Sequence, residues 1–293
     1  PVAGHLVHMP SHIYLRVGRY HDAVIANHKA SMADEDYIAQ CNAQGFYPAA
    51  YYPHNIHFLW AASTMEGRSA IAIESARKVA ANVQLEMIEQ FPGVEFFNTI
   101  PLLALTRFGR WDEILLEPAP PANLEYSTAI WHYVRAKKGD LDAARAEHVK
   151  LVQLREAANV TFLDSIFYPA TQLLTIADDL VQGDIAMAQD QYGEAIAHFQ
   201  RAVETQSELS YTEPPFWYYP TRHTLGKALL TAGDAAAAEE VYRTDLAQYP
   251  RNGWALFGLI QSLQAQGKEA NEIQQRLDQI WAQADVTLTA SSF

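Results

Sequence analysis

The chain has 293 residues, 49% of them hydrophobic, so it can bury a large core as one elongated domain or two compact ones. Its 21 basic and 34 acidic side chains give a net charge of −13, which argues against a nucleic-acid partner or an anionic membrane surface. The single cysteine, Cys41, excludes a disulfide within the chain and any Cys-x-x-Cys metal motif, and we expect it to be a buried, unreactive thiol.

The sequence also lacks the features of a membrane or secreted chain. No apolar run approaches the roughly 20 residues that a spanning helix needs, and the first residues lack the basic and apolar regions of a signal peptide. We therefore expect a soluble protein, with the cytoplasm slightly favoured. Because the chain begins at Pro1, inside patterned sequence, we also expect it to be a fragment without its N-terminal half.

A short pattern recurs along the chain. It consists of an apolar-patterned helix, a turn that contains glycine, a small residue shortly afterwards, and a second amphipathic helix. Glycine supplies the left-handed conformation that such turns need, and one helical hairpin cannot bury its apolar face alone. Stacked neighbours must therefore share a core. In chain order the turn position holds Gly18, Gly67, Gly109, Gly139, Asp190, Gly233 and, in a weaker last copy, Gly267.

Strand signals are nearly absent, because no run of alternating β-branched residues adjoins an Asn-Gly or Asp-Gly turn. We therefore predict an all-α fold. The prolines of EPAPPAN interrupt the series at residues 117–123, where the alternatives are a flexible joint or a long loop inside one array of repeats. We favour the loop, because the repeats continue in the same style on both sides.

The recurring pattern resembles the tetratricopeptide repeat (TPR), about 34 residues long with the consensus W-x2-L-G-x2-Y, then A-x3-F, then P. The resemblance implies a single TPR-like α-solenoid over residues 1–293, in which about six to seven irregular pairs of antiparallel helices form a right-handed superhelix. The residues that match the consensus best are Leu225, Gly226, Gly233, Ala238, Tyr242 and Pro250.

Two short sequence motifs are more specific to one family than the repeat consensus is. They are HMPSHI near the start of the chain and EPPFWYYP from Glu213 onward. With these motifs the chain resembles a family of bacterial TPR-repeat proteins whose function is poorly defined. In that family an upstream half rich in His and Glu precedes this part. The resemblance implies that this half packs on the first repeat, but it supplies no activity.

Five of the 11 histidines fall in two short segments. His5, His8 and His12 stand at i, i+3 and i+7, and His54 and His57 at i and i+3, so each set shares one face of a helix. Counted back from the turn glycines, both sets occupy the repeat positions that line the concave groove of TPR proteins. Because first helices of adjacent repeats pack about 8–10 Å apart, we expect these imidazoles to converge.

Converging imidazoles are the ligand set that Zn, Fe or Cu prefers and that Ca or Mg does not. Three nitrogens and a water would leave an open catalytic position, whereas four would form a closed structural site. No general base is built into the spacing, and the candidate carboxylates are Glu66, Asp34 and Asp36. The alternatives are a polar groove in which the histidines only pack and hydrogen-bond, and a pH-sensitive peptide groove.

A second candidate site is the segment EPPFWYYPTRH. Its prolines and aromatic rings would form a rigid wall for a peptide or small-molecule ligand, and Arg222 could hold a carboxylate in a bidentate fork. We favour the alternative of a structural turn, because aromatic stripes on helical proteins are usually core. The candidate ligand-binding residues are Glu213, Trp217, Tyr218, Tyr219, Arg222 and His223.

Two functions from different classes follow. The first is a metal-binding solenoid, with hydrolysis or oxidation as open possibilities, in which the five clustered histidines hold a transition metal. The second is a TPR scaffold that holds a peptide or protein partner without chemistry, which rests on analogy of fold alone. We expect the scattered histidines to be surface or core groups, namely His21, His28, His132, His148 and His198.

Overall fold

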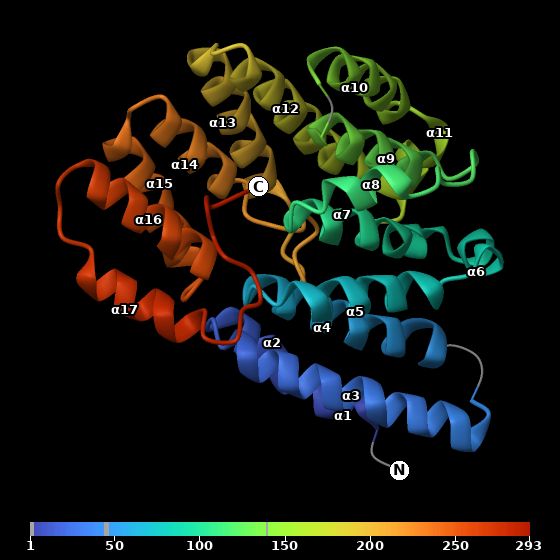
Figure 1. Ribbon diagram of the computed structural model, residues 1–293. Helices are drawn as coiled ribbons and strands as arrows, with labels where there is room; N and C mark the ends of the chain where they lie inside the picture. Colours follow the sequence, from blue (N-terminus) through green and yellow to red (C-terminus); the bar gives the residue numbers. More distant parts are fainter. Residues whose placement is uncertain (1–2, 44–46, 139) are drawn as a thin grey trace.

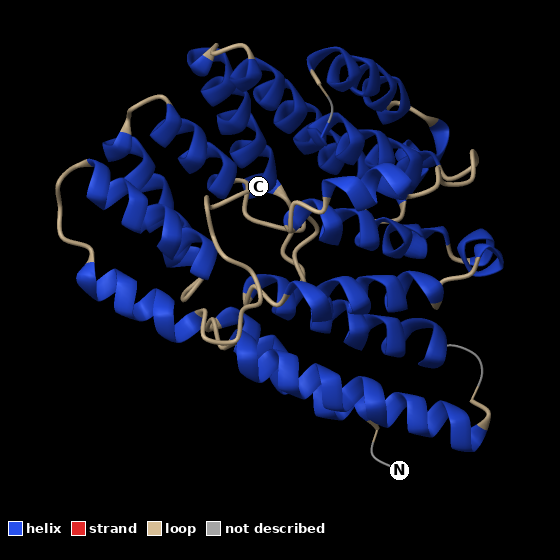
Figure 2. Cartoon of the chain, viewed as in Figure 1, coloured by secondary structure: helices blue, strands red, loops and turns tan. Residues whose placement is uncertain are grey.

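The structure is a computed structural model that describes residues 3–43, 47–138 and 140–293, in which helices are joined by loops and no strand occurs (Figure 2). The all-α prediction is confirmed. The α-helices are α1 (Gly4–His8), α2 (Pro10–Arg16), α3 (Tyr20–Cys41), α4 (Tyr52–Met65), α5 (Ser69–Ala81), α6 (Leu85–Gln90), α7 (Ile100–Arg107), α8 (Trp111–Leu116), α9 (Glu125–Lys138), α10 (Leu141–Arg155), α11 (Ala158–Ser165), α12 (Ala170–Ala188), α13 (Tyr192–Glu208), α14 (Arg222–Thr231), α15 (Ala235–Gln248), α16 (Gly253–Ala265) and α17 (Asn271–Ile280). A π-helix, η1 (Tyr47–Tyr51), and a 3-10 helix, η2 (Pro92–Thr99), complete the set.

Most helices pack as pairs of sequence neighbours joined by short turns, which makes the two helices of a pair antiparallel. The pairs are α2 with α3, α4 with α5, α7 with α8, α9 with α10, α12 with α13, α14 with α15, and α16 with α17. The predicted turn residues have the expected positive φ at Gly18, Gly67, Gly109, Asp190, Gly233 and Gly267. Gly139 lies outside the described residues.

The two ends of the helical array meet (Figure 1). A Cβ on Gly18, in the first turn, would lie 1.8 Å from the carbonyl oxygen of Pro250. On the next pair, a Cβ on Gly67 would lie 2.3 Å from the ring of Trp281. Trp254 also donates from Nε1 to a carbonyl near the end of α4, at 3.1 Å. The helices therefore follow a path that returns the C-terminal repeats to the N-terminal ones.

Two loop features bear on the sequence expectations. The loop 117–123 is tied to its neighbours, since Glu117 accepts a hydrogen bond from Arg77 at 2.6 Å and its carbonyl accepts one from Trp131 at 3.1 Å. Cys41 is exposed, so the expectation of a buried thiol was wrong. It lies in the last turn of α3, beyond Asp34, which is the last buried residue of that helix.

The outer side of α1 and α2 is apolar and exposed. Leu6, Met9, Ile13 and Val17 stand along this side, with exposed fractions from 44% to 71%. Among the described residues, no helix combines the length and the apolar character needed to cross a membrane.

The contact between the C-terminal and N-terminal helices should contribute to the stability of the fold. Asp285 accepts hydrogen bonds from the first two amides of α5, Ser69 N at 2.6 Å and Ala70 N at 2.9 Å, and thereby caps a helix more than 200 residues away. We expect Asp285→Ala to lower the free energy of unfolding by about 1 kcal/mol, as for other caps, measured by urea titration. The control is Asp278→Ala on α17; equal midpoints for the two variants would contradict the capping role.

Candidate metal centre

Three of the predicted histidines lie on one side of the first helical segment. Pro10 has no N–H, so the hydrogen-bond ladder is interrupted between α1 and α2. Met9 nevertheless keeps a helical backbone, with φ −48° and ψ −39°. The helical register therefore continues through the break, and His5, His8 and His12 keep the common face that their spacing predicts.

A buried carboxylate fixes the position of α1. Asp34 of α3 accepts hydrogen bonds from the Tyr47 hydroxyl and the Asn55 side chain, both at 2.7 Å, and the same hydroxyl accepts from the backbone N–H of His5 at 3.2 Å. A Cβ on Gly4 would lie 2.1 Å from Asp34 Oδ1, so only glycine permits this close approach. Asp34 thus holds α1, α3, η1 and α4 together and is fully engaged in doing so.

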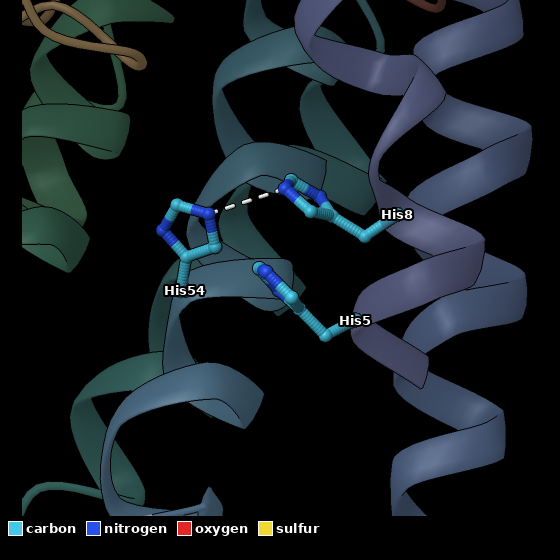
Figure 3. A group of neighbouring side chains, drawn as sticks. All are labelled: His5, His8 and His54. Carbon is cyan, nitrogen blue, oxygen red and sulfur yellow. Dashed lines mark hydrogen bonds between the residues drawn. The ribbon is translucent and has the colours of Figure 1, made fainter. Parts of the chain in front are cut away.

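Four imidazoles gather where α1, α2 and α4 meet. Figure 3 shows His5 and His8 of α1 facing His54 of α4, and these three residues each offer a ring nitrogen within 4.8 Å of the other two. The Nε2 atom of His8 is the centre of the group. It lies 3.1 Å from His54 Nε2 and 3.0 Å from His12 Nε2.

The protonation of His8 follows from its partner. Its Nδ1 lies 2.6 Å from Asn27 Oδ1, while Asn27 Nδ2 donates to the carbonyl of Ala23 at 2.8 Å and to Ser11 Oγ at 3.0 Å. Because a carbonyl can only accept, the Asn27 amide is oriented with its oxygen toward His8. His8 Nδ1 therefore carries the proton. Burial lowers the pKa of His8 to about 4, so at neutral pH its Nε2 presents a lone pair to the cluster.

His12 is anchored in the same way, by a residue 201 positions further along the chain. Its Nδ1 lies 2.6 Å from Oε2 of Glu213, and the Tyr211 hydroxyl donates to the other carboxylate oxygen. A carboxylate accepts, so His12 Nδ1 also carries a proton and directs Nε2 at His8. When His12 is neutral, two lone pairs face each other across 3.0 Å. They repel unless a cation, either a proton or a metal ion, lies between them.

The dimensions of the cluster are close to those of a metal site. Nitrogens in tetrahedral Zn sites lie roughly 3.3 Å apart, given Zn–N distances of about 2.0–2.1 Å. The two Nε2 separations are 3.0 and 3.1 Å, so small side-chain movements would accommodate an ion. His5 adds a further donor, because its Nδ1 is buried and has no hydrogen-bond partner among the described residues.

The surroundings of the cluster keep His8 and His54 neutral. The ring of Phe58 packs against His8, His12 and His54 at centroid distances of 4.5, 4.6 and 4.9 Å. Burial, together with the neighbouring histidines, lowers the pKa of His54 to about 3. Neutral imidazoles are the form that binds metals.

His57, the fifth predicted histidine, lies apart from this group. It stacks on Trp60 at 5.1 Å and contacts Phe96 and Phe97, both at 5.5 Å. Burial alone lowers its pKa to about 3. With His54 it lines a cavity of about 160 Å³ beside the cluster. His57 therefore faces this cavity rather than the other imidazoles.

The other two candidate carboxylates do not reach the cluster. Glu66 pairs with His21 at 2.7 Å, its pKa raised by burial, and Asp36 is exposed. His28 is exposed on α3. The remaining histidines pair with carboxylates at 2.5 to 2.9 Å, namely His132 with Glu147, His148 with Asp178 and His198 with Asp179.

The segment EPPFWYYPTRH lines a larger cavity of about 280 Å³. The candidate residues that line it are Glu213, Trp217, Tyr218, Tyr219 and Arg222. His223 does not line it. Its fully buried ring lies between Arg107 Nη2 and Asp245 Oδ2, each at 3.1 Å, beneath the C-terminal residues.

Sequence reasoning did not single out Asn27 or Phe58. Phe58 stands at i+4 from His54, a spacing that could have placed it against the cluster. Asn27 carries no such signal. Glu213 was predicted as a ligand-binding residue, whereas its hydrogen bond makes it the anchor of His12.

Comparisons with known proteins add no assignment: no protein-family model matches the chain, and no curated protein matches it. The fold and the geometry of the site therefore define the class of protein. It is an all-helical protein whose paired helices bring together a histidine cluster and two cavities.

The burial of His57 predicts a pH dependence. Its pKa is about 3 in the folded protein and about 6.5 when unfolded, so the unfolded state binds more protons between these values. Its contribution to stability is thus complete above about pH 6.5 and is lost as the pH falls toward 3. Between about pH 7 and pH 4.5, we expect the wild type to lose on the order of 2 kcal/mol more than His57→Phe in urea unfolding.

The matched control is His28→Gln, an exposed histidine on α3, which should keep the wild-type pH dependence. If His57→Phe loses as much stability as the wild type over this range, His57 is not held neutral by burial.

Proposed function

We propose that the protein binds a transition metal ion through His5, His8 and His54, with His12 as the fourth imidazole. The observation that carries the proposal is the pair of facing Nε2 atoms of His8 and His12 at 3.0 Å, each on a ring whose Nδ1 proton is held by an acceptor. A single proton satisfies one such pair. A metal ion satisfies all the converging nitrogens at once.

The donor set selects the metal. Neutral imidazoles suit Zn, Cu or Fe, whereas Ca and Mg require oxygen ligands. No carboxylate belongs to the proposed first set of ligands. Glu213 and Asn27 instead hold the outer nitrogens of His12 and His8, as carboxylates and amides do around many metal-bound histidines. They fix the tautomer and the ring orientation of each ligand before the metal binds.

We infer that a small molecule can lie next to the metal site on the side of His54. This residue also lines the cavity of about 160 Å³ that His57 and the aromatic rings of η2 enclose. A metal in such a position supplies a Lewis acid or a bound water of lowered pKa. The apolar walls would exclude bulk water, and His57 would orient a molecule held there.

We also infer that the helix pairs form a TPR-like right-handed superhelix. The support is the recurrence of a positive-φ residue at the turn positions Gly18, Gly67, Gly109, Gly233 and Gly267. In this arrangement the superhelix is short enough for its last repeats to reach the first, and the metal ligands and their anchor come from opposite ends of the chain.

Metal content tests the proposal. Protein purified without a histidine tag or chelator, or reconstituted and dialysed, should hold about one equivalent of Zn, Cu or Fe by mass spectrometry. We expect His8→Ala with His54→Ala to abolish metal retention while helicity measured by circular dichroism persists. His28→Ala, on the exposed side of α3, should retain the full equivalent. Equal metal contents in the double variant and this control would contradict the site.

The carboxylate anchor gives an independent test. Glu213→Gln keeps the shape of the side chain but removes the charge that holds His12, so we expect metal affinity to fall about 10- to 100-fold. Competition with a chromophoric chelator measures this change. Glu208→Gln, an exposed residue at the end of α13, is the control. Unchanged affinity in Glu213→Gln would show that His12 needs no anchor to bind metal.

A further inference from the structure

The cavity of about 280 Å³ lies between the first helix pair and the segment from α13 to α14. Eight of its lining residues are aromatic, among them Tyr20, Trp60, Trp217 and Tyr249. The volume is at the lower end of the range of about 300–1,000 Å³ that is typical of small-molecule sites. It suits a molecule about the size of one aromatic amino acid and leaves no room for a folded segment.

The inner wall carries hydrogen-bond donors without acceptors. Tyr20 Oη, Trp60 Nε1 and Trp217 Nε1 are buried and have no partner in the part of the chain that the structure describes. Each of the three side chains is only 3% exposed. Most buried donors in proteins have a hydrogen-bond partner, because a donor without one costs about 1–3 kcal/mol. All three belong to side chains that line this cavity.

The outer edge of the cavity is cationic. Arg16 of α2 lies over the Tyr211 ring at 5.2 Å, and Arg222 of α14 donates to Gln248 Oε1 at 2.9 Å. Neither guanidinium forms an ion pair with a carboxylate among the described residues, although the chain carries a net charge of −13. Burial and Asp245 raise the pKa of Tyr249 to about 12, with Arg222 and Arg16 opposing them, so both cations lie near one phenol.

The one acidic side chain in the wall is already occupied. Glu213 accepts from His12 with one oxygen and from Tyr211 with the other, so its charge is directed at the histidine cluster. Two guanidinium groups therefore remain at the edge for a ligand, and guanidinium matches a carboxylate in geometry as well as charge.

We propose that this cavity binds a small carboxylic acid with an aromatic or similarly flat apolar body. The body lies among the aromatic rings, and the carboxylate meets Arg16 and Arg222. The site is separate from the metal ligands and does not require the ion, although Glu213 belongs to the walls of both regions.

Isothermal titration calorimetry on the full chain tests the proposal. The probes are phenylacetate and indoleacetate, each compared with its uncharged amide. We expect saturable binding of one or both acids with one site per chain. The matching amide should bind at least about tenfold more weakly, because the charge-assisted hydrogen bonds are lost. Arg16→Gln with Arg222→Gln should weaken the acid about tenfold or more and leave the amide unchanged.

The controls separate this site from the metal centre and from general charge effects. Arg276→Gln, exposed on α17, should bind the acid like the wild type. His8→Ala with His54→Ala, which lacks the proposed metal ligands, should also keep acid binding, so failure of the metal proposal would leave this result intact.

Four outcomes would overturn the inference. The first is equal affinity for the acid and its amide. The second is undiminished acid binding in the double arginine variant, and the third is no saturable binding of either acid at millimolar concentration. Tighter binding of a short acetylated peptide ending in phenylalanine would likewise overturn it, because the ligand would then be a chain terminus rather than a small molecule.

Discussion

The contact on which the candidate site depends is the hydrogen bond of 2.6 Å between His12 and Glu213, residues 201 positions apart. It exists only because the paired helices return the C-terminal part of the chain to the first turn, where Gly18 meets Pro250. The closure therefore does more than add packing. It supplies the carboxylate that fixes the His12 tautomer. That tautomer directs His12 Nε2 at His8 Nε2, and the two lone pairs repel unless a cation lies between them.

The same closure unites the two features that the sequence presented separately. The histidine-rich start of the chain and the EPPFWYYP segment share one region, in which Glu213 joins the cluster to the larger cavity and His54 joins it to the smaller one. The imidazoles lie on one side, and aromatic walls with a cationic edge lie on the other. An ion and a small acid could thus be held side by side without competing for ligands, because Glu213 is engaged with His12.

Local patterns predicted what depends on local geometry. The spacing of His5, His8 and His12 predicted their shared face, and turn residues such as Gly67 predicted the helix pairs. Contacts between residues far apart in the chain could not be predicted from these local patterns. His57 follows His54 by the same three residues that separate His8 from His5, yet it packs against Phe96 of η2, because which helix lies beside each residue is set by the tertiary fold. His223 was predicted to bind a ligand, yet its buried ring pairs with Asp245 and its carbonyl accepts a hydrogen bond from the Ser291 hydroxyl.

The most direct test of the central claim is X-ray absorption spectroscopy on the metal-loaded protein. The account predicts a first shell of three or four nitrogens at about 2.0–2.1 Å for Zn, with the outer scattering that imidazole rings produce. A shell made of oxygens, or one in which imidazole scattering persists unchanged in His8→Ala with His54→Ala, would contradict it. Either result would mean that the histidines gather for packing and hydrogen bonding alone.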